Sequence, residues 1–158
     1  SSIGSCSSEV FSFDNVLSFT GRNGNVKDCS STAFYIKRAK GLDFRNITIE
    51  NGNIGFNTWD TEDIYYHNCV FRNLSNALYI TGCQGSYMYD LEMCNISING
   101  LCLQQESSDS IMRGLDIRDS ETVASCGEYC NLTIQLFNLF FQLFGLVRHL
   151  DHLGHFFL

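Results

Sequence analysis

One seven-residue pattern recurs along this chain at nearly constant spacing, and it constrains the fold more than any other feature. Its copies begin 22, 22 and 24 residues apart: RNITIEN at 45–51, HNCVFRN at 67–73, YDLEMCN at 89–95 and RGLDIRD at 113–119. A second motif keeps the same step and reads AFYI from Ala33, GFNT from Gly55, ALYI from Ala77 and GLCL from Gly100. Two motifs in phase indicate one structural unit stacked on copies of itself, each burying its apolar side against its neighbours.

Within a repeat, apolar residues alternate with polar ones, as they do in segments 34–36, 42–44 and 47–49. No window between residues 34 and 117 carries the longer 3.6-residue periodicity of a helix. We therefore expect an all-β fold with three short strands per repeat, stacked as a right-handed parallel β-helix of about four to five coils. The expected inward columns are Ile47, Cys69, Leu91 and Leu115; Ile49, Phe71, Met93 and Ile117; and Phe34, Phe56, Leu78 and Leu101.

The turns agree with this architecture. The seventh motif position is Asn or Asp in every copy, and the second position is Asn, Asp or Gly. These residues tolerate left-handed backbone geometry, and stacked amides hydrogen-bond from coil to coil at the strand spacing. Proline is absent from all 158 residues, which fits a fold in which almost every N–H joins a neighbouring strand.

Residues 33–119 resemble the right-handed parallel β-helix, or pectin-lyase-like, superfamily, whose coils have a similar period and often end in an Asn turn. The resemblance covers a little over half of the chain. It implies a fold rather than one activity, because that superfamily includes lyases, hydrolases, epimerases, adhesins and non-catalytic surface repeats. No specific enzyme family is matched: the Asn-Thr-Asp element of polygalacturonases is interrupted at Asn57-Thr58-Trp59, and no Asp-Asp or Gly-His-Gly occurs.

Three segments are expected. Residues 1–32 are interpreted as a degenerate N-terminal coil or cap, residues 33–130 as the repeats, and residues 131–158 as a hydrophobic tail. Three hypotheses remain for the tail, whose first 17 residues carry no charge: a cap on the open core, a membrane-associated segment, or a truncation or frame artefact. Its histidines His149, His152 and His155 are interpreted as a solvated polar edge in preference to a metal site.

Composition indicates an acidic extracellular or cell-surface protein. A net charge of −7 and a pI near 4.9 argue against a nucleic-acid partner. Eight cysteines favour a secretory setting. Four sequons are candidate glycosylation sites and indicate the same setting: Asn46, Asn73, Asn95 and Asn131. The alternative is that these Asn, Ser and Thr residues are present because the turns of such a fold use them.

The cysteines are expected to differ by face. Cys69 occupies an inward position and should be a buried thiol. Cys94 and Cys102 occupy outward positions, and one or the other should be disulfide-bonded or readily labelled. Cys126 and Cys130 are interpreted as a local bridge, two free thiols or, least favoured, half of a zinc site, because no second Cys pair at zinc spacing accompanies them.

The most suggestive polar stretch is the turn Trp59-Asp60-Thr61-Glu62-Asp63. Trp59 can stack on a sugar face together with Tyr79 one coil away, while Asp60, Glu62 and Asp63 can hydrogen-bond a glycan or bind Ca²⁺. A solvated turn with ion pairs between coils is the alternative for the three acids. No cofactor is otherwise indicated.

Two functions are carried forward. The first is a non-catalytic secreted or surface module that binds a polysaccharide or cell-surface glycan. The second is a fragment of a polysaccharide lyase or glycoside hydrolase acting on extended acidic glycans, which needs at least two acidic groups and one basic group in one groove.

The sequence generates a test of the Trp59 site. If the ligand is an extended glycan lying across Trp59, Tyr79 and the acidic turn, Trp59→Ala should weaken its binding by about 1–3 kcal/mol, the loss typical of an aromatic anchor, with little loss of stability because a turn residue makes few core contacts. Titration calorimetry and thermal unfolding of the variant check this. A variant that unfolds more easily yet binds glycan normally would make Trp59 a packing residue.

Overall fold

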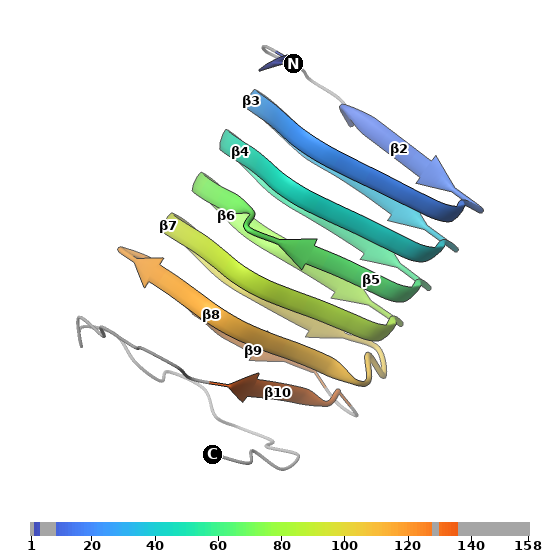
Figure 1. Ribbon diagram of the computed structural model, residues 1–158. Coiled ribbons are helices and arrows are strands. Elements are labelled where there is room, and N and C mark those ends of the chain that lie inside the picture. Colours follow the sequence, from blue (N-terminus) through green and yellow to red (C-terminus); the bar gives the residue numbers. More distant parts are fainter. Residues whose placement is uncertain (1, 4–8, 128–129, 136–158) are drawn as a thin grey trace.

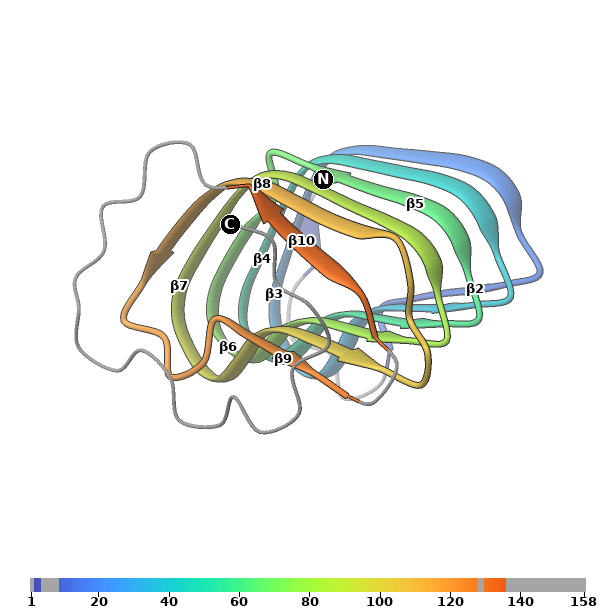
Figure 2. The ribbon, with the colours of Figure 1, turned by 90° about the horizontal axis from the view of Figure 1, so that it is seen from below.

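The computed structural model describes residues 2–3, 9–127 and 130–135, and within these the chain contains strands and no helix. The strands belong to one ten-stranded sheet in which every pair is parallel. The sheet winds into a β-solenoid of about six turns with a period of about 22 residues. The turns follow one another in chain order along the stack, and each overlies the next (Figures 1 and 2). The predicted all-β parallel fold is confirmed.

The strands are longer than the predicted three per coil, because most corners do not interrupt them. Those from Leu17 to Gln104 are bent around the core, and three of them run for 20 or 21 residues. Their bounds are β1 Ser2–Ile3, β2 Phe11–Asp14, β3 Leu17–Lys37, β4 Lys40–Trp59, β5 Glu62–His67, β6 Val70–Thr81, β7 Gln84–Gln104, β8 Ser110–Arg118, β9 Ala124–Cys126 and β10 Leu132–Gln135. A single residue with positive φ turns such a corner, so the hydrogen-bonded ladder continues through it.

The inward columns lie in the predicted register. Ile49 pairs with Phe71, Phe71 with Met93, and Met93 with Ile117. The column through Phe34 extends beyond the recognised repeats, to Phe11 at one end and Ala124 at the other. The structure therefore has about six turns where the motifs predicted four to five, because the terminal coils keep the backbone pairing after their sequences have diverged from the motif.

Packing in the core is aromatic at the N-terminal end. The rings of Phe34 and Phe56 stack with centroids 4.5 Å apart, and Phe11 extends the stack at 4.8 Å. Residues one coil apart in a parallel column are separated by about the strand spacing, which brings like rings into face-to-face contact. The Tyr66 hydroxyl is also buried, and it shares a 3.1 Å hydrogen bond with Thr58.

All eight predicted turn positions have φ between 50° and 62°. At one corner, three of these residues and the preceding Asp28 form a column of hydrogen-bonded side chains. We call it the asparagine ladder, and its members are Asp28, Asn51, Asn73 and Asn95. Each Asn donates from Nδ2 to the Oδ1 of the preceding member, at 3.0, 2.8 and 2.9 Å. The ladder joins four successive coils outside the core.

The prediction that Cys69 is a buried thiol is confirmed, and neither Cys94 nor Cys102, the two outward candidates, forms a disulfide. Cys69 is fully buried, and burial raises the pKa of its thiol to about 11. Cys94 is half-buried and free, as an outward position allows. Cys102 is also free and lies in the outward column between Tyr79 and Ser125, but it is only 4% exposed, so it is neither bonded nor readily labelled. The reason is steric, since the bulkier Tyr79 lies beside it on the preceding coil.

Part of the expected architecture lies outside the described residues. This concerns residues 136–158 with their three histidines, and residues 4–8 near the N-terminus. Within the described residues, Leu132–Gln135 forms β10 and pairs with β8. No helix in the described part is long and apolar enough to cross a membrane.

The asparagine ladder yields a stability prediction. Asn73→Gly keeps the positive φ but removes two amide hydrogen bonds, so it should lower the free energy of unfolding by about 1–2 kcal/mol. Asn73→Ala should cost about 1 kcal/mol more, because a Cβ is strained in that conformation. Urea denaturation measures both.

Asn53→Ala, at an exposed position without positive φ, is the control and should change stability by less than about 0.5 kcal/mol. Equal stability of Asn73→Ala and the unmodified chain would contradict the role of the ladder.

Candidate functional site

One outer side of the solenoid carries aromatic and charged side chains on successive coils. It is formed by the first segment of β4, by β5 and by the first segment of β7, where inward residues such as Leu42 and Phe44 alternate with outward ones. We call this surface the aromatic face. It has two outward columns, namely Asp43, Tyr65 and Tyr87, and Arg45, His67 and Tyr89.

Rings on the aromatic face stack along both columns. Tyr65 and Tyr87 have centroids 4.7 Å apart with an interplanar angle of 17°, and His67 and Tyr89 are 5.0 Å apart at 22°. Across the columns, the rings of Tyr65 and His67 are parallel, with an interplanar angle of 0° and centroids 6.2 Å apart. Tyr65 and His67 thus form a platform of two parallel rings, and each ring rests on the aromatic ring of the next coil.

The opposite side of the platform has no ring to cover it. There the register partner of Tyr65 is the short Asp43, and that of His67 is Arg45. An open surface groove of about 320 Å³ spans the coils of β4, β5 and β7 here. It is lined by Gly41, Leu42, Asp43, Arg45, Tyr65, His67 and Tyr89.

The groove contains one tight ion pair. Arg45 Nε lies 2.9 and 2.8 Å from the two carboxylate oxygens of Asp43, and its Nη2 lies 2.6 Å from Oδ2. The hydrogen bonds from Arg45 hold the pKa of the Asp43 carboxyl below its usual range, against the opposing effect of burial. His67 Nε2 is 3.9 Å from Asp43 Oδ1, so the imidazole lies at the edge of this pair.

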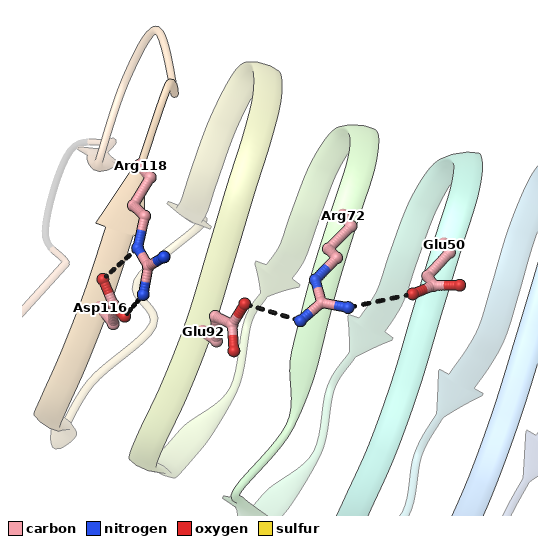
Figure 3. A network of polar contacts seen from close by, with 5 residues as sticks. All are labelled: Glu50, Arg72, Glu92, Asp116 and Arg118. Atoms are coloured by element: carbon pink, nitrogen blue, oxygen red, sulfur yellow. Dashed lines mark hydrogen bonds and ion pairs between the residues drawn. The ribbon is translucent and has the colours of Figure 1, made fainter.

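A second outer side carries the charge ladder, a chain of ion pairs between coils. Lys27 contacts Glu50 at 2.8 Å, and Arg72 contacts both Glu50 at 3.3 Å and Glu92 at 2.8 Å. Figure 3 shows Arg72 between its two carboxylate partners, Glu50 and Glu92. The pair Asp116–Arg118 lies on the coil that follows Glu92. The carboxylates are met by guanidinium and ammonium groups of this chain, so this side has few charges left for a ligand.

The Trp59 site predicted from sequence lies on a third outer side. Trp59 pairs with Thr81 and Asn57 pairs with Tyr79, which puts Trp59 and Tyr79 on the same outward face of adjacent coils. The indole N–H donates to Asn57 Oδ1 at 2.8 Å, and the Tyr79 hydroxyl donates to Gln104 at 2.9 Å. Their polar groups are therefore already bonded within the chain.

The three predicted acids occupy the adjoining corner. Asp60 and Asp63 have φ of 48° and 52°, so both turn the backbone there. Glu62 is ion-paired with Lys40 at 2.6 Å. Across the part of the chain that the structure describes, no three or more His, Cys, Asp or Glu side chains form a group that could hold a metal ion. A role of Trp59, Tyr79 and these acids in binding glycan remains a prediction.

Sequence analysis missed Asp43, Arg45, His67 and Tyr89. The signal that could have found them is the first position of the seven-residue motif, which is polar or aromatic in all four copies: Arg45, His67, Tyr89 and Arg113. The period predicts that these residues share one outward column, but not that the rings of His67 and Tyr89 stack.

The sequon asparagines are exposed. Asn46 donates to Asn23 at 3.0 Å, and Asn73 and Asn95 belong to the asparagine ladder, so these amides have a structural role in the corners. Glycosylation at Asn46, Asn73, Asn95 and Asn131 remains a prediction.

Comparisons with known proteins add little to this geometry. No family model matches the chain, and no curated protein matches it. Among solved structures, QnrB1, a plasmid-mediated fluoroquinolone resistance protein, is similar with 11% identity over 81% of this chain and 80% of that one, at a TM-score of 0.34. Membership of the pectin-lyase-like superfamily stays a prediction, while the parallel β-solenoid architecture is established.

The charge ladder yields a pH prediction. The hydrogen bond from Lys27, with a further one from Arg72, lowers the pKa of Glu50 in the folded state. A lowered pKa means that the stabilisation is present above the unfolded-state pKa, near 4.3, and is lost as pH falls through the folded value. Glu50→Gln should therefore be less stable than the unmodified chain at pH 7, by no more than about 1 kcal/mol because solvent screens these pairs.

Once the pH lies below the lowered folded-state pKa of Glu50, the difference between Glu50→Gln and the unmodified chain should vanish. Urea denaturation from pH 2.5 to pH 7 follows it, with Glu121→Gln at an exposed position as the control. A stability gap that is the same at every pH would contradict the ion-pair assignment.

Proposed function

We propose that this chain is a secreted or cell-surface binding module that holds an extended glycan on its aromatic face, without cleaving it. The observation that carries this proposal is the pair of parallel rings of Tyr65 and His67 beside the groove. Aromatic rings bind sugars by stacking against the apolar face of the pyranose ring, and a two-ring platform offers an area of that size.

The groove supplies polar groups around the platform. The Asp43 carboxylate and the Arg45 guanidinium line the side opposite the rings, where they can accept and donate hydrogen bonds to sugar hydroxyl groups. Tyr89 extends the lining by one coil.

The rigidity of the platform favours binding. Tyr65 is supported by Tyr87 and His67 by Tyr89, so their rings are held in place before a ligand arrives. A ligand then pays little for ordering these side chains, which is how preorganised sites gain affinity. The Trp59 face lacks a stacked ring pair among the ring contacts of the described residues.

The alternative function is a fragment of a polysaccharide lyase or glycoside hydrolase, and the groove offers one observation in its favour. A carboxylate, a guanidinium and an imidazole, from Asp43, Arg45 and His67, line the same space. Both Asp43 oxygens are hydrogen-bonded by Arg45, which suits a fixed binding surface better than proton transfer. Incubation of the chain with acidic polysaccharides tests the alternative, and release of new chain ends would favour an enzyme.

The proposal predicts a loss of affinity on removal of the platform. Tyr65→Ala should weaken binding of an oligosaccharide selected from a glycan array by about 1–3 kcal/mol, while Tyr65→Phe should retain most of the affinity because the ring remains. Titration calorimetry measures both variants. Tyr79→Ala, on another outer side, is the matched control and should bind as the unmodified chain does. Normal binding by Tyr65→Ala together with lost binding by Tyr79→Ala would place the site on the Trp59 face instead.

A further inference from the structure

The basic side chains around the groove act on one carboxylate, that of Asp43. Arg45 contacts it through three distances of 2.6–2.9 Å, and His67 Nε2 lies 3.9 Å from its Oδ1. Arg22, the register partner of Arg45 on the preceding coil, is exposed and is not part of the groove lining. The hydrogen bonds from Arg45 are the main cause that lowers the pKa of the Asp43 carboxyl, and electrostatic interactions with His67 and Arg22 act in the same direction.

The Asp43 carboxylate therefore occupies the position that an anionic ligand would take. Arg45 meets both of its oxygens with Nε and Nη2, the two-point geometry in which arginine also binds the carboxylate of a ligand. The Asp43 side chain is 22% exposed and that of Arg45 is 45% exposed, so the carboxylate is the more enclosed member of the pair. A second anion in the groove would compete for the same guanidinium and would lie within a few Å of a like charge.

An uncharged sugar meets no such conflict. The contacts to Asp43 use Nε and Nη2 of Arg45, so Nη1 still has hydrogen atoms to donate, and each carboxylate oxygen still has a lone pair to accept with. A hydroxyl group both donates and accepts, so adjacent hydroxyl groups of one pyranose ring can bond the carboxylate and the guanidinium together. The parallel rings of Tyr65 and His67 lie beside this pair and offer a surface for stacking.

We infer that the groove takes uncharged glycans, and that Asp43 is the specificity-determining residue that excludes glycans carrying carboxylate or sulfate groups. This inference rests on the proposed function, since it names the class of sugar that the same groove accepts. Selectivity of this kind comes from a repulsive group placed against the wrong ligand. The net charge of −7 acts in the same direction, because it repels acidic polysaccharides at a distance. The lyase or hydrolase alternative requires the opposite preference.

Three oligosaccharides with one backbone test the inference: cellohexaose, its derivative oxidised to a carboxylate at every C6, and its derivative sulfated at every C6. With a charge on every sugar, any residue of the chain that enters the groove brings an anion with it. Calorimetric titration of the full chain at pH 7.5 gives the ratio of neutral to anionic affinity. We expect cellohexaose to bind at least about tenfold more tightly than either derivative.

One substitution and a matched control make the test specific. Asp43→Asn keeps the shape of the side chain but removes its charge and leaves Arg45 without a charged partner in the groove, so the ratio should fall by about tenfold. Asp116→Asn is the control, because Asp116 is paired with Arg118 at the same two-residue spacing on the side of the charge ladder. It changes the net charge equally and should leave the ratio as it is. Circular dichroism and urea denaturation confirm that both variants are folded.

Each outcome supports or overturns the inference. If an anionic derivative binds as tightly as cellohexaose, or if Asp43→Asn changes the ratio no more than Asp116→Asn does, the inference is wrong while the proposed function stands. If none of the three oligosaccharides binds, the glycan array decides. Acidic glycans among its hits overturn the inference, and neutral glycans alone support it. A blank array removes the proposed function together with the inference.

Discussion

Everything in this molecule depends on strict vertical register between successive coils. Each residue hydrogen-bonds and packs against the residue about 22 positions away, so one repeat length sets both the core and the surface. A corner made by one residue with positive φ keeps that register without breaking the ladder, as at Asn51 and Asn73. Hydrogen bonds between the side-chain amides of Asn51, Asn73 and Asn95 stabilise the corner itself. The register shifts at two places, between Cys29 and Thr32 and between Leu74 and Asn76, and the inward columns continue beyond both.

Much of the fold could be predicted from the sequence, because alternation and period are both visible there. The columns through Phe34 and Ile49 follow from those two signals alone. The number of coils could not be predicted, since the coils containing Phe11 and Leu132 are held by backbone pairing without the motif. The burial of Cys102 was missed for a different reason: its exposure is set by a side chain on another coil, Tyr79.

The candidate site could be predicted only in part. The sequence places Tyr65 and Tyr87 on an outward surface, and the structure adds that their rings stack and that the ring of His67 lies parallel to that of Tyr65. Such an arrangement depends on side-chain rotamers, which the repeat does not specify. The turn from Trp59 to Asp63 was predicted to be a binding site because it contains three acidic residues within four positions. Asp60 and Asp63 adopt the positive φ of the corner, and Glu62 forms an ion pair with Lys40. These structural roles partly explain why three acidic residues occur in this turn.

A solenoid separates stability from recognition, because inward residues build the core while outward columns are free to vary. On this chain one outward side is occupied by ion pairs and another by a preorganised aromatic platform beside a groove. The most direct test of the account is a crystal structure with a bound oligosaccharide taken from the glycan array. We expect a pyranose ring stacked on Tyr65 and His67, with hydroxyl groups hydrogen-bonded to Asp43 or Arg45. A sugar seated on Trp59 and Tyr79, with the groove unaltered, would contradict the account.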